Sequence, residues 1–134
     1  MTRYHPTSVY RNKPGRPPNT TTKTTTVRID HDVIYDEYDT SFIKKYAKRI
    51  PFKVISMSIR RSTGNNTHVK VVVEGILSPL DELMVRAVFH DDARRIRGDL
   101  ERYLTNSPVF GLLFDEKYYP LSGELVKAGD WVKV

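Results

Sequence analysis

The sequence of 134 residues contains no cysteine. Disulfide bonds, thiolate zinc sites and cysteine nucleophiles are therefore excluded, and any bound metal must be held by carboxylate, imidazole or backbone oxygen groups. Such sites favour hard divalent cations, so we expect Mg²⁺ or Mn²⁺ if the protein is catalytic and no cofactor if it is not.

Long apolar runs are also missing. The longest, such as residues 71–73 and 111–114, are far shorter than the roughly 20 residues that a membrane-spanning helix needs, and the N-terminus has no apolar signal core. A composition with 39% hydrophobic and 28% charged residues suits one globular domain. We therefore expect a cytoplasmic protein with a single domain and no membrane partner.

Acidic residues are absent from the first 28 positions, which carry six lysines or arginines. The other 16 basic residues are balanced by all 16 acidic residues, so the net charge of +6 belongs to this N-terminal part. A basic arm on an electrically balanced body is typical of nucleic-acid-binding proteins, because it releases counterions from phosphates. A solubilising tail is the alternative. The arm residues that we expect to contact phosphates are Arg3, Arg11, Lys13, Arg16 and Lys23.

The arm is poor in apolar residues and holds four of the eight prolines, so residues 1–25 are predicted to be disordered without a partner. Residues 26–134 are predicted to form the single domain. Within the arm, the segment Lys13-Pro14-Gly15-Arg16-Pro17-Pro18 resembles the Gly-Arg-Pro core of AT-hook-like minor-groove binders. A plain Pro/Gly linker explains this segment equally well.

The first half of the domain shows both strand and helix periodicity. Val27 and Ile29 alternate with polar residues and predict a short strand. Residues 41–50 have apolar residues at helical spacing and precede Pro51, which predicts a helix of about three turns. Residues 52–59 and 67–74 then predict a β-hairpin with a polar turn.

The second half begins with a helix signal, Ser78-Pro79, which predicts a helix from Pro79. The helical period breaks at residues 90–92, where Asp91 or Asp92 is expected to cap a second segment. Residues 111–114 predict a buried strand and residues 131–134 a short edge strand. The resulting order β-α-β-β-α-β predicts an α+β fold with a ferredoxin-like or RRM-like sheet and two helices on one face.

Acidic and histidine residues fall at the ends of the predicted strands. Asp30 and Asp32 end the first strand on the same face, because strand side chains repeat every second residue. His68 begins the third strand, and Asp115 ends the fourth. The first and third strands are neighbours in a split βαβ sheet, so we expect Asp30, Asp32 and His68 to converge, with Asp115 joining through the twist of the sheet.

The order of these residues, with Ser62-Thr63-Gly64 leading into His68, resembles the palm of the archaeo-eukaryotic primase and primase-polymerase superfamily. The resemblance implies a catalytic set of Asp30, Asp32, His68 and Asp115. In it, Asp30, Asp32 and Asp115 would bind two metals, His68 would contact the triphosphate, and the Ser62 turn would bring backbone amides to phosphate. It also implies a role in replication.

The chain departs from that superfamily because it has neither the additional α/β unit nor the zinc module. A minimal or degenerate relative that binds nucleic acid without making it is therefore an open alternative. The patterns around Ser62–His68 and Asp91–Ile96 also resemble those of small phage and archaeal-virus proteins. In the plainer interpretation, Asp30 and Asp32 begin a loop, His68 is a solvated strand-end residue, and the arginines of residues 94–102 form a solvated salt-bridge face.

The hairpin carries further cations. Arg60, Arg61 and Lys70 flank its turn and could follow a phosphate backbone, with Tyr118 and Tyr119 as stacking platforms, although core positions are the default for aromatic residues.

A ribbon-helix-helix regulator is another alternative, because a basic arm precedes a strand at residues 25–30. We therefore predict a nucleic-acid-binding protein, with DNA as the expected partner. It is either a primase-like nucleotidyltransferase of a virus or mobile element, or a non-catalytic DNA-binding protein or regulator.

Overall fold

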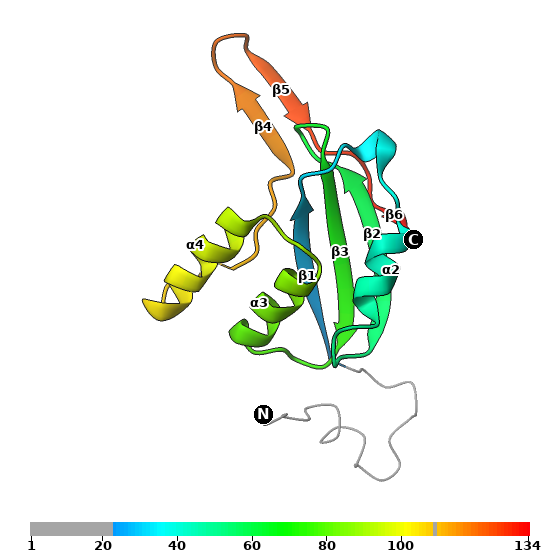
Figure 1. Cartoon of the computed structure of the whole chain (residues 1–134). Helices are drawn as coiled ribbons and strands as arrows, with labels where there is room; N and C mark the ends of the chain where they lie inside the picture. Colours follow the sequence, from blue (N-terminus) through cyan, green and yellow to red (C-terminus); the bar gives the residue numbers. More distant parts are fainter. Residues whose placement is uncertain (1–22, 109) are drawn as a thin grey trace, which may run out of the picture.

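The computed structural model describes residues 23–108 and 110–134, which form an α+β fold with a four-stranded sheet and a separate two-stranded sheet (Figure 1). The elements in chain order are β1 (Thr24–His31), η1 (Tyr35–Glu37), α2 (Ser41–Ala47), β2 (Val54–Arg61), β3 (Thr67–Glu74), α3 (Pro79–Val88), α4 (Ala93–Leu104), β4 (Glu116–Tyr119), β5 (Glu124–Lys127) and β6 (Val132–Lys133).

The larger sheet has the order β1-β3-β2-β6, and all its neighbouring strands are antiparallel. The predicted hairpin is confirmed as β2 and β3, and the predicted edge strand as β6. The chain crosses from β1 to β2 through α2 and then returns as β3 between them. This unit places Asp30 of β1 directly opposite His68 of β3.

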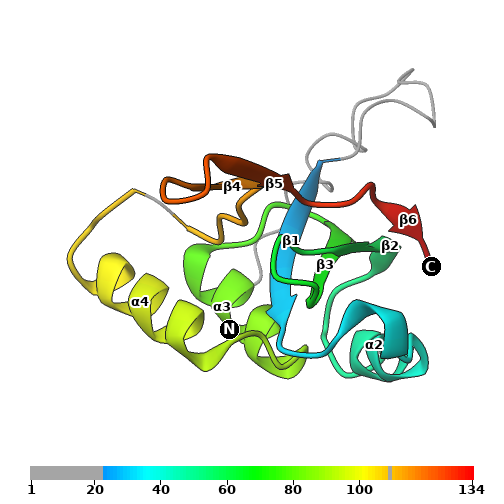
Figure 2. The same ribbon diagram turned by 90° about the horizontal axis from the view of Figure 1, so that it is seen from above.

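The hydrophobic core lies between this sheet and the helices, which occupy one side of it (Figure 2). Alternate residues of β1 and β3 are fully buried there, and Ile43 of α2 and Val85 of α3 pack against them. The predicted helix start is confirmed, because the Ser78 side chain accepts a hydrogen bond from the Asp81 amide. The predicted recapping is also confirmed, since the Asp92 side chain accepts from the Arg94 amide at the start of α4.

Several boundaries differ from the predictions. β1 begins at Thr24, so the last two residues of the predicted arm belong to the sheet, whereas residues 1–22 lie outside the described part of the chain. The helix α2 has only seven residues. The Asp32–Asp39 segment that follows β1 contains the short η1 turn and no α-helix, although the ribbon-helix-helix reading needs an α-helix there.

The predicted strand at residues 111–114 is wrong, because these residues form an irregular segment in which Leu112 and Phe114 are largely exposed. β1 is therefore an edge strand, and the fourth strand of the sheet is β6, beside β2. The hairpin β4–β5 follows the irregular segment and projects beyond the sheet (Figure 1). Among the described helices, none has the length and apolarity to cross a membrane.

Candidate nucleic-acid interface

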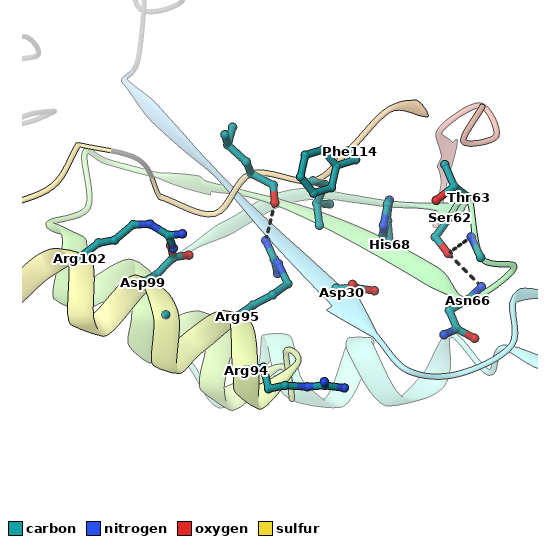
Figure 3. Close-up of a pocket in the computed structure, with 14 residues that line it drawn as sticks. Asp30, Ser62, Thr63, Asn66, His68, Arg94, Arg95, Asp99, Arg102 and Phe114 are labelled. Carbon is teal, nitrogen blue, oxygen red and sulfur yellow. Dashed lines mark hydrogen bonds and ion pairs between the residues drawn. The ribbon is translucent and has the colours of Figure 1, made fainter. Parts of the chain in front are cut away.

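A pocket of about 610 Å³ opens where β1, β3 and the β2–β3 turn meet α4 and the irregular segment (Figure 3). We call it the arginine pocket. Its lining consists of a carboxylate and an imidazole from the sheet, residues of the turn, one face of α4, and apolar side chains. These residues are Asp30, Ser62, Thr63, Gly64, Asn66, His68, Arg94, Arg95, Gly98, Asp99, Arg102, Leu112, Leu113 and Phe114.

Asp30 and His68 are the two predicted catalytic residues that line this pocket. Burial raises the pKa of the Asp30 carboxyl above its usual value, and the nearby carboxylates of Asp91 and Asp92 act in the same direction. The Arg95 guanidinium opposes this shift. Asp30 is therefore a carboxylate whose negative charge a cation or a hydrogen-bond donor would stabilise.

His68 is buried, and its Nδ1 accepts a hydrogen bond of 3.0 Å from Nε of Arg60. Since Arg60 can only donate, Nδ1 is unprotonated and the neutral imidazole carries its proton on Nε2. Burial, with the positive charges of Arg60 and Arg95, lowers the pKa of His68 to about 4. His68 is thus a neutral group with one N–H donor and not a solvated strand-end residue.

The arginines of the pocket come from one face of α4. Arg95 donates to a carboxylate oxygen of Asp91 at 2.5 Å and to the Leu112 carbonyl at 3.2 Å. Arg102 pairs with Asp99 at 2.8 Å. The exposed Arg94 forms no side-chain ion pair within residues 23–108 and 110–134, so its charge is available to a ligand.

Arg86 of α3 organises the wall behind these arginines. Its side chain is 1% exposed and forms ion pairs with Asp91 at 2.7 Å and Asp99 at 2.6 Å. Asp91 also accepts a hydrogen bond of 2.7 Å from the Asp30 amide. The expectation of a wholly solvated salt-bridge face is therefore wrong for Asp99, which is buried. Sequence reasoning missed this cluster, because Arg86 lies among apolar helix positions.

The β2–β3 turn uses its amides internally. The Ser62 hydroxyl accepts hydrogen bonds from the Gly64 amide at 3.2 Å and the Asn66 amide at 3.0 Å, and the Asn65 amide donates to the Ser62 carbonyl. These three amides are therefore not aimed at an incoming phosphate, in contrast to what the primase resemblance implies.

Asp32 and Asp115 do not join the pocket. Asp32 accepts a hydrogen bond of 2.9 Å from the Asn66 side chain. Asp115 is exposed and pairs with Arg60 at 2.9 Å. The predicted convergence is therefore limited to Asp30 and His68, and within the described residues no three His, Asp or Glu side chains are close enough to hold a metal ion together.

The hairpin cations have different environments. Arg60 is buried and stacks with its guanidinium carbon 4.5 Å from the Trp131 ring centre, so its predicted position on an open phosphate track is wrong. Arg61 pairs with Asp36 at 2.7 Å on the surface. The ammonium group of Lys70 lies 4.5 Å from the Trp131 ring centre.

A second cavity, of about 290 Å³, lies on the sheet face that is turned away from the core. We call it the sheet-face pocket. Its lining residues are Arg28, Arg60, Lys70, Leu112, Leu113, Asp115 and Trp131. It shares Leu112 and Leu113 with the arginine pocket, so the two cavities are neighbours. Sequence reasoning missed Arg28 and Trp131, although the alternation of β1 could have placed Arg28 on this face.

No known protein family, curated protein or solved structure matches this chain. The primase resemblance therefore stays a prediction. The function has to be argued from the two neighbouring pockets and from the charges around them.

Proposed function

We propose that the protein binds single-stranded nucleic acid across the arginine pocket and the sheet-face pocket. The observation that carries the proposal is the position of Phe114. Phe114 is 77% exposed, yet it lines a pocket to which α4 contributes Arg94, Arg95 and Arg102. An exposed aromatic ring beside a group of cations is the arrangement that stacks a base and holds its phosphate.

Each part of the arginine pocket has a role in this proposal. The available guanidinium of Arg94 would bind a phosphate, and Phe114 would stack on an unpaired base. His68 would donate from Nε2, and the Asp30 carboxylate would accept, so the pair can recognise a base edge or a sugar hydroxyl. A base inside a duplex cannot reach such a ring, which is why we propose a single strand.

The neighbouring sheet-face pocket would continue the track. Arg28 and Lys70 lie on the sheet face opposite the helices, and Trp131 provides another ring there. The β1-α2-β2-β3 unit has the element order with which a ferredoxin-like or RRM-like arrangement begins, and in RRM domains this face of the sheet binds nucleic acid. The cations of residues 1–22 would add phosphate contacts that do not depend on sequence.

The test is a titration of the full chain with a fluorescent single-stranded oligonucleotide. The Phe114→Leu variant should bind about tenfold more weakly, because one stacked base contributes roughly 1–3 kcal/mol. The matched control is Tyr118→Leu, which removes an exposed ring of β4 outside both pockets and should bind like the wild type. Equal affinity of the Phe114 variant and the wild type would refute the proposal.

The salt dependence gives a second readout. Arg94→Gln should reduce the slope of log affinity against log salt by about 0.7, the value for one phosphate of a single strand. Arg97→Gln removes an exposed charge of the same helix outside the pocket and is the control. Equal reductions in both variants would mean that the helix attracts phosphate diffusely and not through the pocket.

A second candidate is primase-like nucleotidyl transfer in replication, which is supported by the position of Asp30 opposite His68. It requires Asp32 and Asp115 to move toward Asp30 around two divalent cations, and Asp115 to leave Arg60. Mg²⁺ or Mn²⁺ should then raise the melting temperature, and Asp30→Asn should abolish the increase. If neither metal changes the melting temperature of the full chain, this candidate fails while the binding proposal stands.

A further inference from the structure

A third pocket, of about 230 Å³, lies at the same end of β1 but beside α2. We call it the aromatic pocket. Three carboxylates, two imidazoles and three other aromatic rings contribute to its lining, whereas neither lysine nor arginine does. The lining residues are His31, Asp32, Val33, Glu37, Tyr38, Asp39, Phe42, Tyr46 and His90.

The rings stand around the pocket in mutual contact. The His31 ring centre lies 5.6 Å from that of Tyr38 and 6.5 Å from that of Tyr46. The Tyr46 ring also lies 4.8 Å from the His90 ring. Phe42 belongs to the same wall and is half exposed. Such a group of π-faces attracts cations through the negative face of each ring.

His31 contributes a neutral ring to this wall. Its Nε2 contacts the Phe89 carbonyl and its Nδ1 lies 2.5 Å from the Tyr38 hydroxyl. Since a carbonyl only accepts, Nε2 carries the proton and Nδ1 accepts from Tyr38. Burial lowers the pKa of His31 and raises the pKa of Tyr38, so both are uncharged at neutral pH.

The carboxylates lie at the exposed rim of the pocket. Asp32 and Asp39 are partly engaged, by the Asn66 side chain and by the Ser41 amide respectively. The Glu37 side chain forms no hydrogen bond or ion pair in the part of the chain that the structure describes. The lining of the pocket therefore combines a group of aromatic rings with three carboxylates of exposed residues.

We propose that the aromatic pocket binds an alkylammonium group, such as the trimethylammonium head of choline or of a methylated lysine. An anion would be repelled by the three carboxylates, and a neutral apolar ligand would gain nothing from them. A methylated ammonium is bulky and weakly hydrated, so it exchanges water for π-faces at low cost. Lys45 and Arg49 already lie 5.9 Å from the ring centres of Phe42 and Tyr46, although neither cation lines the pocket.

The first test compares choline with 3,3-dimethyl-1-butanol, which has the same shape but no charge. Each compound is titrated into the full chain while the NMR signals of the tyrosine and phenylalanine rings are followed. We expect choline to bind about five times more tightly than the neutral analogue, since the cation–π contribution distinguishes them. Equal affinity, or no change in the ring signals with choline, would overturn the proposal.

Two variants locate the site. Phe42→Leu keeps an apolar side chain but removes a ring, and Glu37→Gln keeps the shape but removes a charge at the rim. Each should weaken choline binding about threefold or more while leaving oligonucleotide binding unchanged. Phe114→Leu is the reciprocal control, because it removes an exposed ring of the arginine pocket and should leave choline binding unchanged. Choline affinity that is the same in the Phe42 variant, the Glu37 variant and the wild type would refute the assignment.

A peptide arm distinguishes the sources of the ammonium group. One short peptide carries trimethyllysine and a second carries unmodified lysine. Tighter binding of the trimethylated peptide than of free choline would identify a protein side chain as the ligand. Equal affinities of the trimethylated peptide and of free choline would point to a small molecule as the ligand. Either of these two outcomes supports an alkylammonium site. Preference for the unmodified peptide would contradict it, since the carboxylates alone would then account for binding.

Discussion

The arginine pocket and the aromatic pocket have opposite chemistry, although neighbouring residues of one strand reach them. Asp30 lines the first and His31 lines the second. Successive side chains of a strand point to opposite faces, so β1 itself separates the two pockets. Asp30 shares its pocket with guanidinium groups of α4, whereas His31 lies among rings and carboxylates of the η1–α2 region.

The two buried histidines have the same protonation state but different hydrogen-bond partners. Both His31 and His68 are neutral, with the proton on Nε2, because burial disfavours the imidazolium. A cation, Arg60, fixes the Nδ1 of His68, whereas a hydroxyl, that of Tyr38, fixes the Nδ1 of His31. The charge of each pocket is therefore set by the segments that pack on each face of the sheet and not by β1.

Asp91→Asn should have the largest effect on stability, because it weakens the arginine pocket and the aromatic pocket at once. The Asp91 side chain is fully buried and balances Arg86 and Arg95, and His90 beside it lines the aromatic pocket. Removal of this charge leaves the Arg95 guanidinium without its ion pair and leaves Arg86 with Asp99 alone, so the free energy of unfolding should fall by about 3–5 kcal/mol in urea denaturation. Asp92→Asn is the control and should change little, since asparagine also caps helices well. Equal stability of the two variants would contradict this account.

Arg60→Ala should destabilise the sheet face that is turned away from the core. It removes the donor to His68, the partner of Asp115 and the cation on Trp131, so the free energy of unfolding should fall by about 2 kcal/mol. Arg61→Ala removes an exposed ion pair from the next position and should leave the melting temperature nearly unchanged. Calorimetry of both variants checks the contrast, which fails if they melt together.

Acidification should destabilise the protein through the protonation of His68. His68 has a pKa of about 4 in the folded protein and about 6.5 when unfolded, so the unfolded state binds the proton first. The shifted pKa of His68 therefore contributes to the free energy of unfolding in full above pH 6.5, and this contribution is lost as the pH falls toward 4. Its upper limit is about 3 kcal/mol, at roughly 1.36 kcal/mol per pKa unit.

The variant His68→Gln isolates this contribution, because glutamine can still accept from Arg60 and does not titrate. Its stability should depend less on pH between 4 and 6.5 than that of the wild type. Imidazole NMR should also show the Nε2–H tautomer of His68 down to pH 5. A titration of His68 near pH 6.5 would contradict a buried, neutral imidazole at this position.

Gly98→Ala should have the smallest effect, and it should act on one pocket only. Glycine in a helix costs up to about 1 kcal/mol relative to alanine, so the variant should melt at a slightly higher temperature. The added Cβ would lie 3.5 Å from Nη1 of Arg102, an ordinary contact, and would narrow the arginine pocket. Oligonucleotide affinity should fall slightly while choline affinity stays constant, and an equal loss of both would contradict the separation.

Local signals allowed the first half of the fold to be predicted. Alternation, the polar turn and the Ser78-Pro79 start each depend on residues close in sequence, and the structure has the corresponding elements. The apolar run at residues 111–114 misled the prediction, because side chains and not a strand bind its backbone. Asp99 accepts from the Gly111 amide, and Arg95 donates to the Leu112 carbonyl.

The candidate site was only partly predictable for a related reason. Strand register placed Asp30 opposite His68, and register follows from the hairpin and the alternation. Arg60 and Asp115 bind each other although more than 50 residues separate them in the sequence, and no local signal predicts such a long-range contact. The burial of Arg86 was missed for a different reason. Its carboxylate partners lie only 5 and 13 residues away, in the α3–α4 junction and in α4, but the angle at which these two helices meet has no local signal in the sequence.

The turn between β4 and β5 offers a place for a spectroscopic label. Leu121 at this turn is fully exposed, and its hairpin forms a sheet separate from the core. Because the chain has no cysteine, Leu121→Cys would introduce its sole thiol, which one fluorophore could modify without protecting other sites. A dye at this position, paired with an acceptor on an oligonucleotide, would report how far the bound strand lies from the hairpin tip.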